Sequence, residues 1–372
     1  MPLKTSSLKI LIIFLSIFLT LSVLEIGTRL FLKQQTSLVE KGEFIPFTYK
    51  PNLNVSIEKE GGGSNHFITN SFGFVGKEWE KEKPVDTIRI AHLGDSFTAA
   101  VSVPYDVNFT SLIEKGLSEK TGKNFESLNF GIGGQGTGEA LETYKHYARE
   151  FKPDTVILWF FLGNDFEDNL VYEESTKTND PISFGDYIKI FAKKFELAHL
   201  IVNRLAKNPN VANYLHGRVL KRVGDDSLGD EARQLPLTIR LLFTDDKENI
   251  LALERTENFL RDLKSETQKD KAELLVVMIS ANLQVEKEVR EDLFIQYPKL
   301  RDANFDDTRP NSSLVKIFRS LGIEHLDLTE NFKKACIVNC NLYLVPNGHL
   351  SKEGHELAAG GVSRFLEVLL TK

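Results

Sequence analysis

Short apolar runs alternate with amphipathic stretches along most of the chain. Five runs are rich in β-branched and aromatic residues: Thr87–Leu93, Ser127–Gly131, Thr155–Leu162, Glu273–Ser280 and Ile323–Leu328. Continuous apolar runs of this length are typical of parallel strands that are buried on both faces. Between them, apolar residues recur at helical spacing, for instance at Phe109, Leu112, Ile113 and Leu117. The alternation predicts a three-layer α/β/α domain, doubly wound around a five-stranded parallel sheet.

The N-terminal segment differs in character from the rest of the chain. Residues 10–24 carry no charge, and the apolar character resumes after Glu25 and continues to Leu32. As a helix, residues 10–32 would be about 34 Å long, enough to cross a hydrocarbon core of about 30 Å. Because no small-residue cleavage site follows, we expect an uncleaved transmembrane anchor over residues 1–33 and not a cleaved signal peptide. Lysines flank both ends, so charge does not fix the orientation.

The remaining chain divides into a lead-in and one large domain. Residues 34–85 are polar and are interrupted by prolines and by a triple glycine, which predicts a tether and an irregular lead-in without a core of its own. Residues 86–372 carry all five predicted strands. The long interval between the third and fourth strands predicts a helical insertion over about 166–247, which either packs as a subdomain or covers a substrate as a lid.

Composition narrows the possible classes of protein. The 372 residues are 41% hydrophobic and 26% charged, which is typical of a globular domain and not of a disordered chain. The formal net charge of −6 disfavours nucleic-acid binding, because no positive field would neutralise phosphates. The two cysteines, Cys336 and Cys340, could close one small loop or remain free thiols. Zinc-protease and P-loop motifs are absent, and neither a cofactor nor a metal is predicted.

Candidate chemistry gathers where the predicted strands end. Ser96 follows the first strand in a Gly-Asp-Ser turn, a glycine-rich turn that includes Gly134 follows the second, and Asn164 follows the third. His349 precedes the last predicted helix. Because parallel strands end at one edge of a sheet, a hydroxyl nucleophile, two donors and an imidazole base would meet there. Residues 131–136 also match the dinucleotide fingerprint G-x-G-x-x-G, but they follow the second strand and not the first.

These four blocks, in this order, resemble the SGNH or GDSL hydrolases, which are serine esterases and acyltransferases on a flavodoxin-like sheet. The resemblance runs from about residue 87 to the C-terminus, with an interruption over the predicted insertion. The TNSFGF motif at residues 69–74 and an anchor that ends in Glu-x-x-x-Arg are similar to a membrane-anchored bacterial branch of the family. The resemblance implies a single-pass protein whose domain is extracytoplasmic, in the periplasm or at the cell surface.

The resemblance also implies a role for each motif residue. Ser96 matches the nucleophile and His349 matches the general base. The backbone N–H groups of Ser96 and Gly134 and the side-chain amide of Asn164 match the oxyanion donors. The expected chemistry is acyl transfer, in which each oxyanion donor typically contributes about 100- to 1000-fold in rate.

One position departs from the family pattern. Many members of this branch have an aspartate where this chain has Asn347, so the carboxylate that would orient His349 is an amide. In a Ser-His-Asp triad this change costs about 10⁴ in kcat, because the imidazole adopts the wrong tautomer. A backbone carbonyl, or a carboxylate such as Asp327 or Glu353, could take its place.

The sequence therefore predicts an extracytoplasmic serine esterase that acts on O-acyl (acetyl) esters of envelope glycans or on small esters. An O-acyltransferase on cell-envelope polysaccharide is an alternative, because the same acyl-enzyme serves both reactions. A second alternative is a catalytically impaired module that binds a glycan or an assembly partner, which Asn347 favours. The expected partners are an acyl-ester substrate and, through the N-terminal helix, a membrane.

Overall fold

The chain divides into two units, which are described separately. The computed structural model describes residues 16, 19–28, 38–58, 63–177, 235–337, 340–344 and 348–370. The first unit comprises Met1–Ser37 and Thr178–Arg222, and of it only residue 16 and a helical stretch over 19–28 are described. Across the described ranges, no helix combines the length and the apolar character that a membrane span requires. The predicted anchor lies largely outside these ranges.

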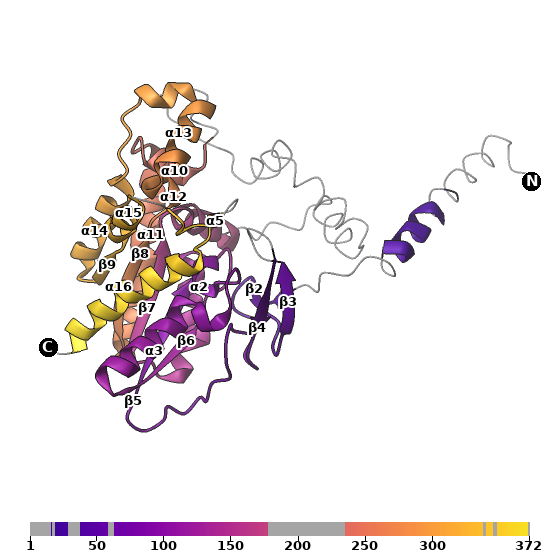
Figure 1. Ribbon diagram of the computed structural model, residues 1–372, viewed down its shortest axis with the longest axis vertical. Helices are drawn as coiled ribbons and strands as arrows, with labels where there is room; N and C mark the ends of the chain where they lie inside the picture. Colours follow the sequence, from indigo (N-terminus) through magenta and orange to yellow (C-terminus); the bar gives the residue numbers. More distant parts are fainter. Residues whose placement is uncertain are drawn as a thin grey trace, which may run out of the picture. The chain divides into compact units, whose positions relative to one another are not determined.

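A five-stranded parallel sheet forms the centre of the second unit, in the order β6-β5-β7-β8-β9 (Figure 1). The strands are β5 (Thr87–Gly94), β6 (Asn124–Asn129), β7 (Thr155–Phe161), β8 (Glu273–Ile279) and β9 (Glu324–Asp327). This confirms the predicted sheet. Only the second strand differs clearly from its predicted range, 127–131. It begins earlier, at residue 124, because its polar residues pair with the start of β5. It ends at residue 129, where the glycine-rich turn begins.

Helices cover both faces of the sheet, as the three-layer prediction requires (Figure 1). One face carries α4 (Thr137–His146), α5 (Asp165–Lys177), α11 (Lys247–Lys269) and α14 (Arg309–Leu321). The other carries α3 (Phe109–Thr121), α15 (Thr329–Ala335) and α16 (Lys352–Leu370). The connecting elements are α2 (Ser96–Ala99), η1 (Tyr105–Val107), η2 (Ala148–Phe151), α10 (Leu237–Leu241), α12 (Asn282–Val285), α13 (Lys287–Gln296) and η4 (Pro298–Asp302). The predicted insertion, about 166–247, includes most of α5 and the whole of α10, both of which contribute residues to the main core. Its residues 178–234 lie outside the described ranges.

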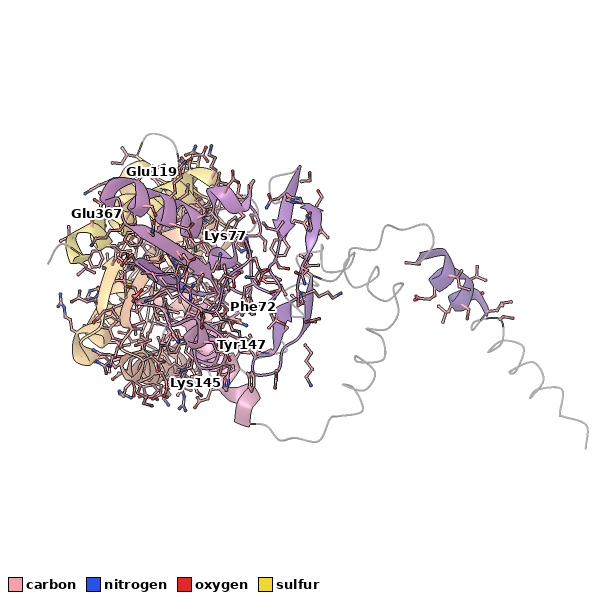
Figure 2. The ribbon with its side chains drawn as sticks, turned by 90° about the horizontal axis from the view of Figure 1, so that it is seen from below. Phe72, Lys77, Glu119, Lys145, Tyr147 and Glu367 are labelled. Atoms are coloured by element: carbon pink, nitrogen blue, oxygen red, sulfur yellow. A yellow bond between two sulfur atoms is a disulfide. The ribbon has the colours of Figure 1, made fainter. Side chains whose placement is uncertain are left out.

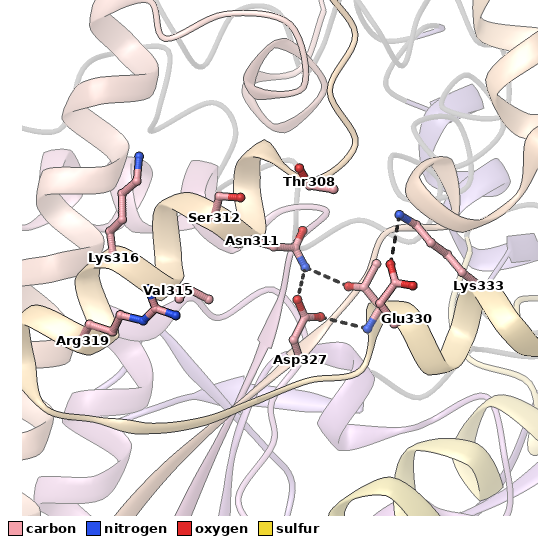
Figure 3. Close-up of a pocket in the computed structure, with 10 residues that line it drawn as sticks. Thr308, Asn311, Ser312, Val315, Lys316, Arg319, Asp327, Glu330 and Lys333 are labelled. Atoms are coloured by element: carbon pink, nitrogen blue, oxygen red, sulfur yellow. Dashed lines mark hydrogen bonds and ion pairs between the residues drawn. The ribbon is translucent and has the colours of Figure 1, made fainter.

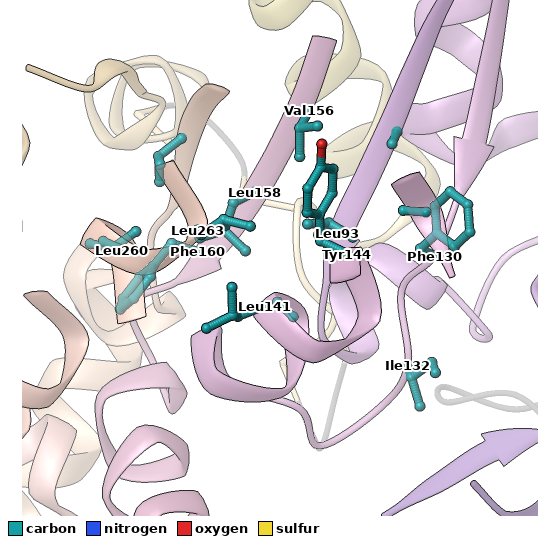
Figure 4. Close-up of a cluster of buried hydrophobic side chains, with 14 of the residues drawn as sticks. Leu93, Phe130, Ile132, Leu141, Tyr144, Val156, Leu158, Phe160, Leu260 and Leu263 are labelled. Carbon is teal, nitrogen blue, oxygen red and sulfur yellow. The ribbon is translucent and has the colours of Figure 1, made fainter. Parts of the chain in front are cut away.

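Side chains of the central strands alternate between two cores. Leu158 of β7 lies in the core that includes Leu141 of α4 and Leu260 of α11 (Figure 4). Its neighbour Trp159 lies in the opposite core, where its ring stacks on Phe109 of α3 with 3.8 Å between centroids. Because both faces are covered, the strands have nearly continuous apolar sequences instead of an alternating pattern.

The lead-in differs from the prediction of an irregular segment, because it folds and packs against the main core. It contains two antiparallel hairpins, formed by β1 (Val39–Lys41) with β2 (Phe47–Tyr49) and by β3 (Asn54–Glu58) with β4 (Ser64–Ile68). After them, Phe74 is fully buried against Phe130, with ring centroids 4.8 Å apart. The Phe72 side chain is labelled in Figure 2. Its ring meets the Phe151 ring edge-on, with 5.1 Å between centroids. Scattered aromatic residues, which have no periodicity in the sequence, attach this segment to the domain.

Candidate active site

The turn after β5 places Ser96 at the carboxyl edge of the sheet. Gly94 has φ +148, and a Cβ atom there would lie 2.9 Å from the carbonyl oxygen of Trp159. The Asp95 carboxylate caps α2 by accepting the Phe97 N–H at 2.9 Å. Ser96 is consequently the first residue of α2, and it is partly exposed. Glycine is needed because the chain passes so close to the neighbouring strand.

The fold brings His349 to Ser96 although 253 residues separate them. Its Nε2 lies 2.8 Å from Ser96 Oγ. The Leu344 N–H donates to the His349 carbonyl at 2.7 Å, and the Gly348 N–H donates to the Leu344 carbonyl at 2.8 Å. The imidazole also lies beside the Phe97 ring, 5.1 Å between centroids. With its proton on Nδ1, the imidazole accepts the Ser96 O–H, which is the geometry of a nucleophile and its general base.

A disulfide lies before His349 in the chain, and a buried histidine lies after it. Cys336 and Cys340 form a disulfide after α15, so of the two possibilities for these cysteines the structure has the closed loop. Beyond His349, the buried His355 accepts the Phe109 N–H at 3.3 Å and so caps α3. Burial, with a smaller contribution from His349, lowers the pKa of His355 to about 3. His355 is therefore a neutral packing and capping residue.

Neither carboxylate that the sequence offers in place of a triad aspartate contacts His349. Asn347 itself lies outside the described residues. Asp327 accepts the Asn311 side-chain N–H at 2.8 Å and a backbone N–H of α15 at 2.9 Å. It lines a cavity of about 370 Å³, formed by residues of α14 and α15 and not by Ser96 or His349 (Figure 3). Glu353 is exposed on α16. The carboxylate of Asp327 is therefore directed at α14 and α15, and among the described residues no hydrogen bond joins it to His349.

The predicted oxyanion donors lie at the same edge as Ser96. A Cβ atom on Gly133 would lie 3.5 Å from Ser96 Cβ, so the glycine-rich turn passes directly beside the nucleophile. Gly134 has φ +73, a left-handed conformation that favours glycine. In the described part of the chain, the backbone N–H groups of Ser96 and Gly134 donate to no other group. Asn164 Nδ2 donates to Asp168 Oδ2 at 2.8 Å. Two unoccupied backbone donors and an oriented amide are what an oxyanion hole requires.

Four carboxyl groups gather behind this edge, and their mutual proximity affects their ionisation. Burial raises the pKa of Asp95 to about 6, although a backbone N–H and the nearby His349 oppose the rise. Burial and the Asp95 charge raise the pKa of Asp168 to about 7, and burial raises that of Glu139 to about 8. Burial also raises the pKa of Asp165, with the Asp95 and Asp168 charges. Within the described ranges, no group of three or more His, Cys, Asp or Glu side chains could hold a metal ion.

One polar group at this site, the Tyr49 hydroxyl of β2, has no counterpart in the sequence-based prediction. It accepts the Gly133 N–H at 3.2 Å, although the two residues are 84 positions apart. Burial raises the pKa of Tyr49 to about 12, so the phenol stays neutral. A single tyrosine in a short polar segment has neither a periodicity nor a motif that would connect it to this turn.

Comparison with known proteins finds remote similarity to solved structures. No protein-family model and no curated protein matches the chain. An acetyl xylan esterase, AlAXEase, is 14% identical with a TM-score of 0.41, over 74% of this chain and 98% of that chain. The lipase/acylhydrolase from Enterococcus faecalis is 13% identical with a TM-score of 0.41, over 75% and 95%. TesA is 11% identical with a TM-score of 0.41, over 76% and 99%. Similarity at this level does not define a family, so the function has to be inferred from the site itself.

Proposed function

We propose that the protein is a serine esterase or acyl hydrolase of the SGNH type. The observation that carries this proposal is the 2.8 Å contact between Ser96 Oγ and His349 Nε2. A hydroxyl hydrogen-bonded to an imidazole, at the carboxyl edge of a parallel sheet, is the pair that nucleophilic acyl transfer requires. The unoccupied N–H groups of Ser96 and Gly134 and the order of the four sequence blocks support it further.

The reaction proceeds in two acyl transfers. His349 Nε2 takes the Ser96 proton while Oγ attacks the ester carbonyl, and the donors at Ser96, Gly134 and Asn164 bind the developing oxyanion. The tetrahedral intermediate collapses, the leaving alcohol takes the proton from His349, and the acyl group stays on Ser96. Water then attacks the acyl-enzyme with His349 as base, and the carboxylic acid leaves.

Asn347 sets the expected level of activity. An amide at this position does not stabilise the imidazolium that forms during attack, whereas a carboxylate does. We therefore expect Asn347→Asp to raise kcat by about 10-fold or more, with little change in KM. Ester hydrolysis by both proteins, measured over the same pH range, checks this. An unchanged kcat would mean that another group already orients His349.

The substrate and the location extend this proposal beyond the site. We propose an extracytoplasmic domain, held by the N-terminal apolar segment, which acts on O-acetyl esters of envelope glycans or on small acyl esters. The Cys336–Cys340 disulfide supports such a location, because disulfides persist in oxidising compartments. The alternative of an O-acyltransferase differs only in the acceptor. Acyl release that is unchanged by an added glycan, with the glycan left unmodified, would exclude it.

The test of the proposed function is turnover by the full chain in mild detergent. Wild type, Ser96→Ala and Ser320→Ala are compared for hydrolysis of p-nitrophenyl acetate. Ser320 is a matched control, because its hydroxyl donates to the Ile317 carbonyl of its own helix, α14, at 2.8 Å. We expect turnover in wild type and in Ser320→Ala, and its loss in Ser96→Ala. Folded wild type without turnover would favour the binding module instead.

A further inference from the structure

The TNSFGF motif of the lead-in has no part in the mechanism above, yet its turn has a defined structure. The Asn70 side chain accepts the N–H groups of Phe72 and Phe74, each at 3.0 Å. Gly73 has φ +79, and a Cβ atom there would lie 2.5 Å from the Tyr49 carbonyl oxygen. Glycine therefore allows the motif to close against β2, which fixes the position of Tyr49.

Tyr49 reaches from this turn to the candidate active site. Its side chain is buried, and its ring meets the Phe67 ring edge-on with 5.2 Å between centroids. Its hydroxyl oxygen accepts the Gly133 N–H at 3.2 Å. A Cβ atom on Gly133 would lie 3.7 Å from this oxygen and 3.5 Å from Ser96 Cβ. The phenol and the nucleophile thus flank the same backbone position.

We propose that Tyr49 is a positioning residue of this site: by holding the Gly133 N–H, it fixes the direction of the next N–H, that of Gly134. The inference rests on the proposed function, in which the Gly134 N–H binds the oxyanion. Gly134 is exposed, and in the described part of the chain a Cβ atom there would meet nothing within 4 Å. The turn is instead held at its ends, by Tyr49 before Gly134 and by the Glu139 carboxylate, which accepts the Gly136 N–H at 3.1 Å.

The energetic reason is preorganisation. An oxyanion donor accelerates the reaction only if it already points to where negative charge develops. A displacement of about 1 Å at a catalytic group can cost about 100-fold in rate. A left-handed glycine with no atom packed against its Cα could sample other peptide orientations, and the buried phenol, which holds the preceding N–H, restricts them. The lead-in would then be part of the active site and not only a tether.

The test compares Tyr49→Phe with wild type and with a matched control, Tyr144→Phe, in the full chain. Tyr144 on α4 is also buried, and its hydroxyl donates to the Asp270 carboxylate at 2.8 Å, outside the candidate site. In Tyr49→Phe we expect kcat for p-nitrophenyl acetate to fall about 10- to 100-fold while KM changes less than about 2-fold. Binding of phenylboronic acid, which forms a tetrahedral adduct with the serine, should weaken by a similar factor. Tyr144→Phe should change none of these values.

Hydrogen exchange gives a readout that does not depend on activity. The backbone amides of the peptide that contains Gly133 should exchange faster in Tyr49→Phe than in wild type or Tyr144→Phe, because the Gly133 N–H loses its acceptor. Equal exchange, or equal kcat and boronate affinity in all three active proteins, would overturn the proposal. If the wild type shows no turnover, the proposed function fails. In that case hydrogen exchange still tests the contact between Tyr49 and the turn: faster exchange in Tyr49→Phe supports it, and equal exchange overturns it.

Discussion

Two buried polar networks on the same sheet differ in how completely their groups are paired. In the middle of the sheet, His92 Nδ1 accepts the Trp159 indole N–H at 3.1 Å, so the ring carries its proton on Nε2 and donates it to Ser127 Oγ at 3.0 Å. At the carboxyl edge, Asp95 and Asp165 each keep one buried carboxylate oxygen without a hydrogen-bond partner in the described part of the chain.

The difference fits a structural role for the first network and the catalytic role proposed for the residues around the second. Burying a polar atom without a partner costs about 1 to 3 kcal/mol, so such atoms are rare unless something compensates for them. The His92 network satisfies its groups and stabilises the core. The carboxyl edge keeps poorly satisfied groups around a nucleophile and open N–H donors, which is the pattern expected where stability has been lost in favour of chemistry.

The largest effect should follow from removing the base. His349→Gln removes the proton acceptor of Ser96, so we expect kcat to fall about 10⁴-fold or more. Because His349 is partly exposed, the melting temperature should change little. Initial rates and a thermal melt measure the two quantities. A variant that keeps more than about a tenth of the wild-type rate would contradict the role of His349.

Removing the side-chain oxyanion donor should have the next largest effect. Asn164→Ala deletes an amide that is directed by Asp168, so we expect kcat to fall about 100- to 1000-fold while KM stays within about 3-fold. Steady-state kinetics separate the two parameters. A rise in KM with an unchanged kcat would assign Asn164 to ground-state binding instead.

Two substitutions of Asp168 separate its contact with Asn164 from its charge. Burial raises the pKa of Asp168 from 3.8 to about 7, so the folded state binds more protons between these values. Its contribution to stability is therefore complete below about pH 4 and is lost as the pH rises through 7. Asp168→Asn removes this loss and keeps an acceptor, so it should stabilise the protein at pH 8 by about 1 to 3 kcal/mol with little change in kcat.

Asp168→Ala is the partner variant, because it removes both the charge and the acceptor. We expect a decrease of about 10-fold in kcat, since the Asn164 amide is no longer directed. Urea unfolding at pH 5 and pH 8, together with kinetics, measures both variants. Equal stability of wild type and Asp168→Asn at both pH values would show that ionisation of Asp168 does not destabilise the folded protein.

The smallest effect concerns the satisfied network. Burial lowers the pKa of His92 from 6.5 to about 3, so the unfolded state binds more protons in this range and stability falls as the pH falls from 6.5. His92→Gln should lower stability at pH 7 by about 1 to 3 kcal/mol. This difference should shrink toward pH 5, because only the wild type has an imidazole that must stay neutral. Urea unfolding at several pH values measures this difference in stability between wild type and His92→Gln. A difference that does not change with pH would contradict the lowered pKa of His92.

The sheet could be predicted from the sequence because both of its faces are buried. The central strands β7 and β8 therefore have continuous apolar runs, and Leu158 and Trp159 show how adjacent residues enter opposite cores. Pairs such as Ser96 and His349 could be predicted only as motifs, since 253 residues separate them. The parallel order of the strands places Ser96 at the carboxyl edge of the sheet, and the segment between α15 and α16 brings His349 to it.

The lead-in and its phenol could not be predicted in the same way. The segment is attached by aromatic contacts, such as Phe74 against Phe130, and by hydrogen bonds between distant residues, such as those from Gly133 to Tyr49 and from Asn65 to the Val103 carbonyl. None of these contacts has a local period. Asp327, the last residue of β9, illustrates the opposite case: the sequence offers its carboxylate to His349, but the structure has it accept the Asn311 side-chain N–H from α14. Tertiary partners of single polar residues are decided by packing and not by local sequence.

The most direct measurement of the central claim is the site of reaction with a fluorophosphonate. The folded full chain is treated with the probe, digested, and analysed by peptide mass spectrometry. A nucleophile activated by His349 should carry the phosphonyl mass increment on Ser96 and on no other residue. Folded wild type in which Ser96 stays unmodified, or in which the increment lies on another side chain, would contradict the assignment of Ser96 and His349 as an acyl-transfer pair.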